Sequence, residues 1–192
     1  MPFDLIENRH RVAVWAAARA TSRGVGGLSV RQALDWIERL GLRNLLTGHA
    51  NLPPAAGFDA HHQEWRSNLI SYADQAGKSL SHGGAAKLIN VYLKIAVVCA
   101  SCEDDGATPV AARERLGAIH PPIDRLLLLT LAARQERSPL AARFRKLQAW
   151  SRLSSDEYQE IIDGIRTLLP SSPTELWRIE EFWPVTSDSA DA

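Results

Sequence analysis

One lysine in this chain stands where a side chain could do chemistry, at the start of an apolar helical segment. The stretch SHGGAAKLINVYLK, residues 81–94, holds two of the four lysines in the chain, which has eighteen arginines. Lys87, Asn90 and Lys94 recur at intervals of three and four, so they form a narrow polar stripe on a mostly apolar helix. Apolar surroundings lower the pKa of an amine, and a neutral lysine is a nucleophile that forms Schiff bases. The pattern also fits two surface lysines whose ammonium groups reach solvent from the edge of an amphipathic helix.

A glycine pair comes just before this lysine. Gly77 ends the preceding helical segment, and Gly83-Gly84 lead into the next one. This order predicts a helix, a short turn and a second helix. Such a turn exposes backbone N–H groups at a helix N-terminus, where a phosphate binds favourably. Glycines also mark ordinary connections between helices, so the turn alone does not separate the two interpretations.

A carboxylate follows a rigid turn further along the chain. In IHPPID, residues 119–124, two prolines hold the backbone extended and present Asp124 where the next helix begins. In that position Asp124 could cap the helix. A carboxylate held in this way could also act as a general base or stabilise a developing cation.

These motifs together resemble the helix-hairpin-helix DNA glycosylase superfamily. The resemblance rests on Gly83-Gly84, on Lys87 followed by LINVYL, and on a proline-preceded Asp124 that opens an apolar helix. Asn90 stands three residues after the lysine, in a K-x-x-N pattern that resembles the endonuclease III-like branch. The position of Lys94 resembles the pattern of the archaeal-type 8-oxoguanine DNA glycosylase/lyases. Two departures are Ala85, where a glycine is expected, and residues 101–117, which must form an insertion.

The resemblance implies a mechanism and a set of site residues. Lys87 would attack C1′ of a damaged nucleotide, with Asp124 as its partner, and the resulting Schiff base would permit strand cleavage. Gly83 and Gly84 would place hairpin amides against a phosphate. No cofactor is implied. The expected DNA contacts are Gly83, Gly84, His82, Lys94, His120 and Arg145, and the expected walls of the pocket for the flipped base are Trp65 and Trp150.

Helical patterns cover almost the whole chain. Apolar residues recur at helical spacing, the segments end at glycines, and no long run alternates with a period of two. Capping boxes are expected at Ser29 with Gln32, Ser154 with Glu157, and Ser172 with Glu175. We therefore predict an all-α fold, a compact multi-helix domain over residues 1–184 with a helix-hairpin-helix element. Residues 185–192 are predicted to form a disordered C-terminal tail.

Composition and charge narrow the possible partners. The 192 residues are 45% hydrophobic with zero net charge, but residues 1–150 hold 19 basic and 13 acidic side chains, whereas residues 151–192 hold 3 and 9. A mildly basic body therefore accompanies an acidic C-terminal part. Its densest basic stretch, residues 134–152, is either a solvated helix face or a DNA contact. Cys99 and Cys102 alone supply too few ligands for a zinc or iron–sulfur site, so no metal is expected.

Two functions remain open from the sequence. The first is a lysine-dependent DNA glycosylase/lyase that excises an oxidised purine, with damaged DNA as its partner. The second is a non-catalytic helical module that binds nucleic acid or a protein, with Lys87 and Asp124 as a structural ion pair. The longest charge-free run is too short to span a bilayer. In either case we expect a monomer in the cytoplasm with no membrane partner.

Overall fold

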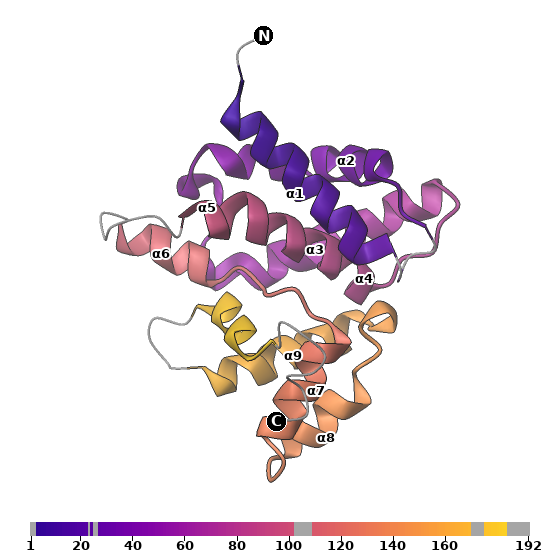
Figure 1. The fold of residues 1–192 in the computed structure, drawn as a ribbon, viewed down its shortest axis with the longest axis vertical. Helices are drawn as coiled ribbons and strands as arrows, with labels where there is room; N and C mark the ends of the chain where they lie inside the picture. Colours follow the sequence, from indigo (N-terminus) through magenta and orange to yellow (C-terminus); the bar gives the residue numbers. More distant parts are fainter. Residues whose placement is uncertain (1–2, 23, 25–26, 102–108, 170–174, 184–192) are drawn as a thin grey trace.

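The computed structural model describes residues 3–22, 24, 27–101, 109–169 and 175–183. Within these ranges the protein is helical and contains no strand, which confirms the all-α prediction (Figure 1). The α-helices are α1 (Leu5–Ser22), α2 (Val30–Arg39), α3 (Phe58–Gln75), α4 (His82–Leu93), α5 (Cys99–Ser101), α6 (Val110–Gly117), α7 (Arg125–Arg134), α8 (Pro139–Lys146) and α9 (Ser155–Leu168). The other helical segments are the 3-10 turns η1 (Leu42–Thr47), η2 (His49–Asn51), η3 (Ala55–Gly57), η5 (Trp150–Arg152) and η6 (Leu176–Phe182), and the π-helical turn η4 (Lys94–Val98).

Local sequence signals explain where several helices begin. Ser29 and Ser154 start α2 and α9 with the predicted capping boxes, in which each serine accepts from the third helical N–H and the residue there binds back to the cap. The predicted cap at Ser172 and the predicted tail over residues 185–192 lie outside the described residues. The helix that was expected after this cap is the 3-10 helix η6 over Leu176–Phe182, rather than an α-helix.

The helix that carries Lys87 runs through the middle of the molecule. It continues from α4 through η4 into α5, and ten of the twelve residues of α4 are buried. The span His82–Ser101 has 20 residues and a mean hydropathy of 1.4, so by length and composition alone it could cross a membrane. However, 72% of its most apolar window is buried inside the protein, as expected for a core helix that is packed on several sides.

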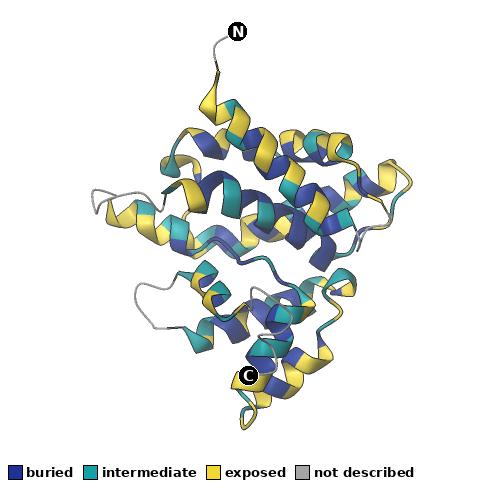
Figure 2. Ribbon diagram, in the orientation of Figure 1, coloured by how far each residue is buried: buried dark blue, intermediate teal, exposed yellow. Residues whose placement is uncertain are grey.

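Two groups of helices pack around this central helix. Figures 1 and 2 show α1, α2 and α3 in one half and α7, α8 and α9 in the other, each half with a buried interior. Two hydrophobic clusters correspond to the halves, and neighbouring residues of α4 belong to different clusters, Ala85 to the first and Ala86 to the second. The segment from Ile119 to Asp124 passes from one cluster to the other. The two residues predicted to do chemistry therefore lie where the halves meet.

Candidate active site

Lys87 and Asp124 are in direct contact. Lys87 extends from α4, and Asp124 is the residue just before α7. The Lys87 Nζ donates to Asp124 Oδ2 at 3.2 Å. The other carboxylate oxygen, Oδ1, accepts from the Leu127 backbone N–H at 2.9 Å and caps α7. One side chain thus fills both roles that the sequence offered for Asp124, as a helix cap and as the partner of Lys87.

Burial changes the acid–base behaviour of Lys87. Its side chain is only 8% exposed. Loss of hydration disfavours the ammonium form and lowers the pKa of Lys87 below its usual value, although the negative charge of Asp124 opposes this shift. A lowered pKa raises the fraction of neutral amine at a given pH. The pair therefore holds a lysine that is both oriented and easier to deprotonate than a surface lysine.

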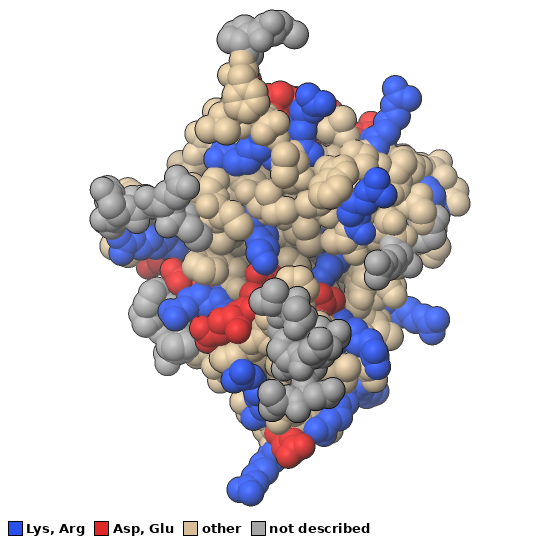
Figure 3. All heavy atoms as spheres, viewed as in Figure 1, with Lys and Arg blue, Asp and Glu red and all other residues tan. Residues whose placement is uncertain are grey.

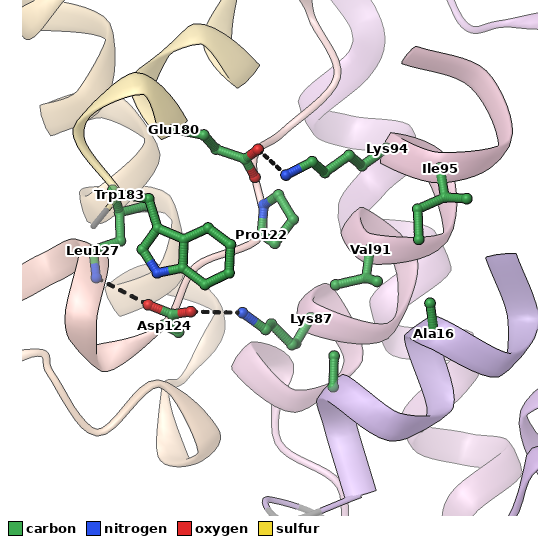
Figure 4. A pocket seen from close by; sticks show the side chains of 11 residues that line it. Ala16, Lys87, Val91, Lys94, Ile95, Pro122, Asp124, Leu127, Glu180 and Trp183 are labelled. Atoms are coloured by element: carbon green, nitrogen blue, oxygen red, sulfur yellow. Dashed lines mark hydrogen bonds and ion pairs between the residues drawn. The ribbon is translucent and has the colours of Figure 1, made fainter. Parts of the chain in front are cut away.

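A cavity of about 280 Å³ opens beside this pair (Figure 4). This size is just below the range of about 300–1,000 Å³ that is typical of small-molecule pockets. Its lining is mostly apolar and comes from six parts of the chain: α1 (Ala16, Ala20), α4 (Lys87, Val91), η4 (Lys94, Ile95), the linker (Pro122, Asp124), α7 (Leu127), and the C-terminal segment (Glu180, Trp183). In Figure 4 the Trp183 ring lies between two ion pairs.

The second ion pair joins Lys94 and Glu180. Lys94 Nζ donates to Glu180 Oε2, and the same amine lies 5.7 Å from the centroid of the Trp183 ring. Burial raises the pKa of the Glu180 carboxyl above its usual value, against the opposing effect of Lys94. Lys94 was predicted to belong to the site, but Glu180 and Trp183 were missed. Their only signal was that EEFWP combines acidic and aromatic residues.

The two predicted pocket tryptophans lie in different places. Trp150 in η5 is near the site, because the Lys87 amine is 5.7 Å from the centroid of its ring. Trp150 is not among the residues that line the cavity, and neither is Trp65. Trp65 packs edge to face on Phe58 with 6.0 Å between ring centroids. Neither predicted tryptophan is therefore a wall of this cavity, although Trp150 lies beside Lys87.

The glycine pair plays a different part from the one expected. The Gly83 N–H donates to Leu153 O at 3.2 Å, and the Gly84 N–H donates to Ser81 Oγ at 3.0 Å. Both amides are therefore already used inside the protein and do not face a phosphate. Gly83 is required for packing instead, because a Cβ at this position would lie 1.9 Å from the carbonyl oxygen of Trp150.

The other residues predicted to contact DNA lie in different parts of the structure. Arg145 is exposed on α8, in a last turn that is rich in basic residues. His82 is half-buried at the start of α4. His120 is only 1% exposed, and its ring nitrogens contact Asp59 Oδ1 at 2.9 Å and the Tyr158 hydroxyl at 3.1 Å. The prediction that His120 contacts DNA is therefore wrong, because its ring lies in the interior with both nitrogens engaged.

A buried polar network fixes the linker that carries Asp124. The side-chain amide of Asn90 donates to Pro121 O at 2.8 Å and to the Tyr158 hydroxyl at 2.9 Å, and its oxygen pairs with His62 Nε2 at 2.8 Å. Asn90 lies one turn after Lys87 on α4, and Pro121 lies three residues before Asp124. The network thus ties the linker to the helix that carries the lysine, which sets the spacing of the pair.

The network ends at a carboxylate near the surface. Burial opposes the ionisation of Asp59, but hydrogen bonds from His120 and Arg166 outweigh it and hold the pKa of this carboxyl below its usual range. Loss of hydration lowers the pKa of His120 and of His62, most strongly for His62. Both imidazoles are therefore neutral at neutral pH. The network consists of hydrogen bonds between neutral side chains, and the Asp59 carboxylate is its charged end.

No protein-family model, curated protein or solved structure matches the chain.

The chemistry open to this site therefore follows from its own residues. A buried amine with a lowered pKa and a fixed carboxylate partner faces an apolar cavity that has an aromatic wall. Such a site suits nucleophilic attack by an amine on an electrophilic carbon. Among the described residues, no three His, Cys, Asp or Glu side chains gather closely enough to hold a metal ion.

Proposed function

We propose that the chain is a DNA glycosylase that uses Lys87 for Schiff-base (AP lyase) chemistry and excises a damaged, oxidised purine. The observation that carries this proposal is the contact of 3.2 Å between the Lys87 amine and Asp124 at the wall of an apolar cavity. A structural ion pair alone requires no adjacent cavity. A nucleophile does require one, because its target must reach the amine.

The proposed reaction uses each member of the pair. The neutral Lys87 amine attacks C1′ of the nucleotide, the glycosidic bond breaks, and the base leaves with the bonding electrons and takes up a proton. The amine loses a proton and the sugar ring opens, which gives a Schiff base between Nζ and C1′. Loss of a C2′ proton then expels the 3′ phosphate by β-elimination. Asp124 accepts the lysine hydrogen bond and stabilises the positive charge that develops on the sugar.

The cavity supplies features that a flipped base requires. Trp183 is 45% exposed and offers a ring face on which a planar base could stack. Lys94 and Glu180 add a hydrogen-bond donor and an acceptor inside the same cavity. A planar base with both donor and acceptor groups on its edge, as in an oxidised purine, fits this combination.

Exposed basic side chains in the half that contains α8 would contact the DNA backbone. In Figure 3 blue side chains gather along the lower right, over the half that contains α8 and α9. The last turn of α8 contributes Arg145 and Lys146, both exposed. Contacts of this kind position a duplex without reading its sequence. His82 and Lys94 remain proposed contacts at the site itself.

An excision assay tests the proposal. A duplex with one 8-oxoguanine is incubated with the protein, released base is measured by chromatography, and strand cleavage is measured on a gel. We expect the wild-type chain to do both and Lys87→Gln to lose both by at least about 100-fold. Trp183→Ala should lose base release but still cleave a duplex with a preformed abasic site, because that substrate has no base to stack. Absence of base release from every oxidised-purine duplex would refute the proposal.

One observation favours the second function, a non-catalytic helical module. The four charged residues of the cavity are matched in two ion pairs, and the Gly83 and Gly84 amides are occupied within the chain. A module of this kind would release no base: it would bind intact and damaged duplexes with equal affinity if its partner is nucleic acid, and neither duplex if its partner is a protein. The same assay, read together with binding to both duplexes, separates the two functions.

A further inference from the structure

Helix α1 is apolar on two different faces. Its inner face is buried in the core and includes Ala13, Val14 and Ala17. Its outer face carries apolar residues in solvent, with Val12 47% and Trp15 54% exposed. The described residues leave eight large apolar side chains exposed, and six of them lie on or beside α1 and α2: Phe3, Leu5, Ile6, Val12, Trp15 and Val30. A helix with apolar residues on both faces is normally covered on both.

These exposed residues border a groove. A groove of about 510 Å³ lies between α1 and α2, with Val12 and Trp15 on one side and Val30 and Leu34 on the other. Along α1, Leu5, Val12 and Trp15 lie seven and three residues apart, so they fall on one stripe that a second helix could meet. The stripe from Leu5 to Arg19 is about 21 Å long, which corresponds to about four helical turns.

The charges around the groove are unbalanced. Arg11, Arg19 and Arg31 are exposed, and within the described ranges none of them has a carboxylate in ion-pair distance. The nearby acidic residues are already engaged. Glu7 and Glu38 pair with Arg43, Asp35 pairs with Arg39, and Asp4 accepts from the Ile6 and Glu7 backbone N–H groups. Figure 3 shows this upper part of the surface as mainly neutral, with separate basic side chains and a few acidic ones. The groove is thus mostly apolar, with Arg11 in its lining, Arg31 next to Val30 in the chain, and the guanidinium of Arg19 5.9 Å from the centroid of the Trp15 ring.

We propose that the α1–α2 groove binds an amphipathic helix of another protein, one with apolar residues along one stripe and acidic residues on its flanks. The apolar stripe would cover Val12, Trp15 and Val30 and remove them from water. The acidic flanks would pair with the three arginines, in the way that flanking charges select partners in coiled coils. This inference is independent of the proposed function, because the groove shares no residue with the cavity beside Lys87.

The charges favour this occupant over two others. A second copy of the chain that paired antiparallel through the same face would bring two Arg11 side chains together near its centre, and like charges oppose association. A DNA backbone would pair with the arginines but would leave the aliphatic side chains without an apolar partner. An acidic amphipathic helix satisfies both the charges and the apolar lining.

Two designed peptides provide the test. One is a fluorescein-labelled helix of about 18 residues with leucine at heptad positions a and d and glutamate at e and g, and the other has lysine in place of glutamate. Fluorescence anisotropy measures their binding to the full chain. We expect the glutamate peptide to bind at least tenfold more tightly than the lysine peptide. Trp15→Ser should weaken the glutamate peptide at least tenfold, whereas Val110→Ser, which removes an apolar side chain that is 72% exposed elsewhere, should not.

A charge exchange and two further measurements complete the test. In Arg11→Glu/Arg19→Glu the preference should reverse in favour of the lysine peptide, with circular dichroism and melting unchanged from the wild type. Equal binding of both peptides, or binding of neither, would overturn the inference. Sedimentation that shows a dimer lost in Trp15→Ser would assign the groove to a second copy instead. Duplex affinity that falls with Trp15→Ser, without glutamate-peptide binding, would assign it to DNA.

Discussion

At the scale of single residues, the site depends on one carboxylate that binds two donors. Asp124 receives the Lys87 amine on one oxygen and the Leu127 N–H on the other. The first contact orients the lysine, and the second fixes the carboxylate against the start of α7. The backbone of α7 therefore fixes the carboxylate, and the carboxylate in turn orients the end of the lysine side chain.

Asp124→Asn separates the charge of this residue from its capping role. An asparagine still caps α7, because its side-chain oxygen accepts the Leu127 N–H. The lost negative charge no longer favours the ammonium form, so the pKa of Lys87 should fall further. Nuclear magnetic resonance of the reductively methylated chain should therefore show the Lys87 midpoint at lower pH than in the wild type.

Asp74→Asn is the matched control for this measurement. Asp74 is an exposed carboxylate near the end of α3 and is not among the groups that influence the pKa of Lys87. Its substitution should leave the Lys87 midpoint in place. An unchanged midpoint in Asp124→Asn would show that the two side chains are not coupled in solution.

At the scale of elements, the entry into α4 depends on Gly83. The start of this helix packs against η5 so closely that the Gly83 N–H binds Leu153 O. We expect Gly83→Ala to destabilise the fold by more than about 3 kcal/mol, because the new Cβ would overlap the carbonyl oxygen of Trp150, which is backbone and has little freedom to move.

Urea unfolding with a second glycine variant tests this packing. Gly48→Ala is the control, because a Cβ at Gly48 would meet nothing within 4 Å. The free energy of unfolding of Gly48→Ala should stay within about 0.5 kcal/mol of the wild-type value. Equal stability of Gly83→Ala and Gly48→Ala would contradict the close contact between α4 and η5.

At the scale of the whole molecule, a neutral polar network joins the two halves. His62 from α3, Asn90 from α4, His120 from the linker and Tyr158 from α9 are linked by hydrogen bonds. All four side chains are buried. Because the linker carries Asp124, the same network that holds the halves together also holds the candidate active site together.

Acid should therefore weaken the whole fold. The pKa values of His62 and His120 lie below 6.5 in the folded chain, so below about pH 6.5 the unfolded chain binds more protons and the free energy of unfolding falls as pH falls. The loss between pH 7 and pH 5 is at most about 2 kcal/mol for each histidine. Thermal or urea melts at several pH values measure it.

His62→Gln should reduce this pH dependence. Glutamine keeps an N–H donor for Asn90 but has no titratable group. His61→Gln, at the exposed neighbouring histidine, should leave the pH dependence unchanged. A fold whose stability is flat from pH 7 to pH 5 would mean that the buried histidines accept protons as easily as in the unfolded chain.

Local signals in the sequence were sufficient for the fold class, whereas the expectation that Lys87 and Asp124 form a pair came from the family resemblance. Serine caps set the starts of α2 and α9, and Gly41 follows the end of α2. The prolines before Asp124 predicted its position at the start of α7. Glu180 and Trp183 could not be predicted, because only tertiary packing brings the C-terminal segment over α4. The burial of His120 and the occupation of the Gly83 amide were missed for the same reason, since each depends on a residue far away in the chain.

The most direct test of the central claim is covalent capture of the lysine. The protein is incubated with a duplex that contains an abasic site, borohydride is added to reduce any Schiff base, and the adduct is mapped by mass spectrometry. The account predicts an adduct on Lys87 that is lost in Lys87→Gln and retained in Lys94→Gln, which changes the other lysine of the same cavity. An adduct on another residue, or none with the folded wild-type chain, would contradict it.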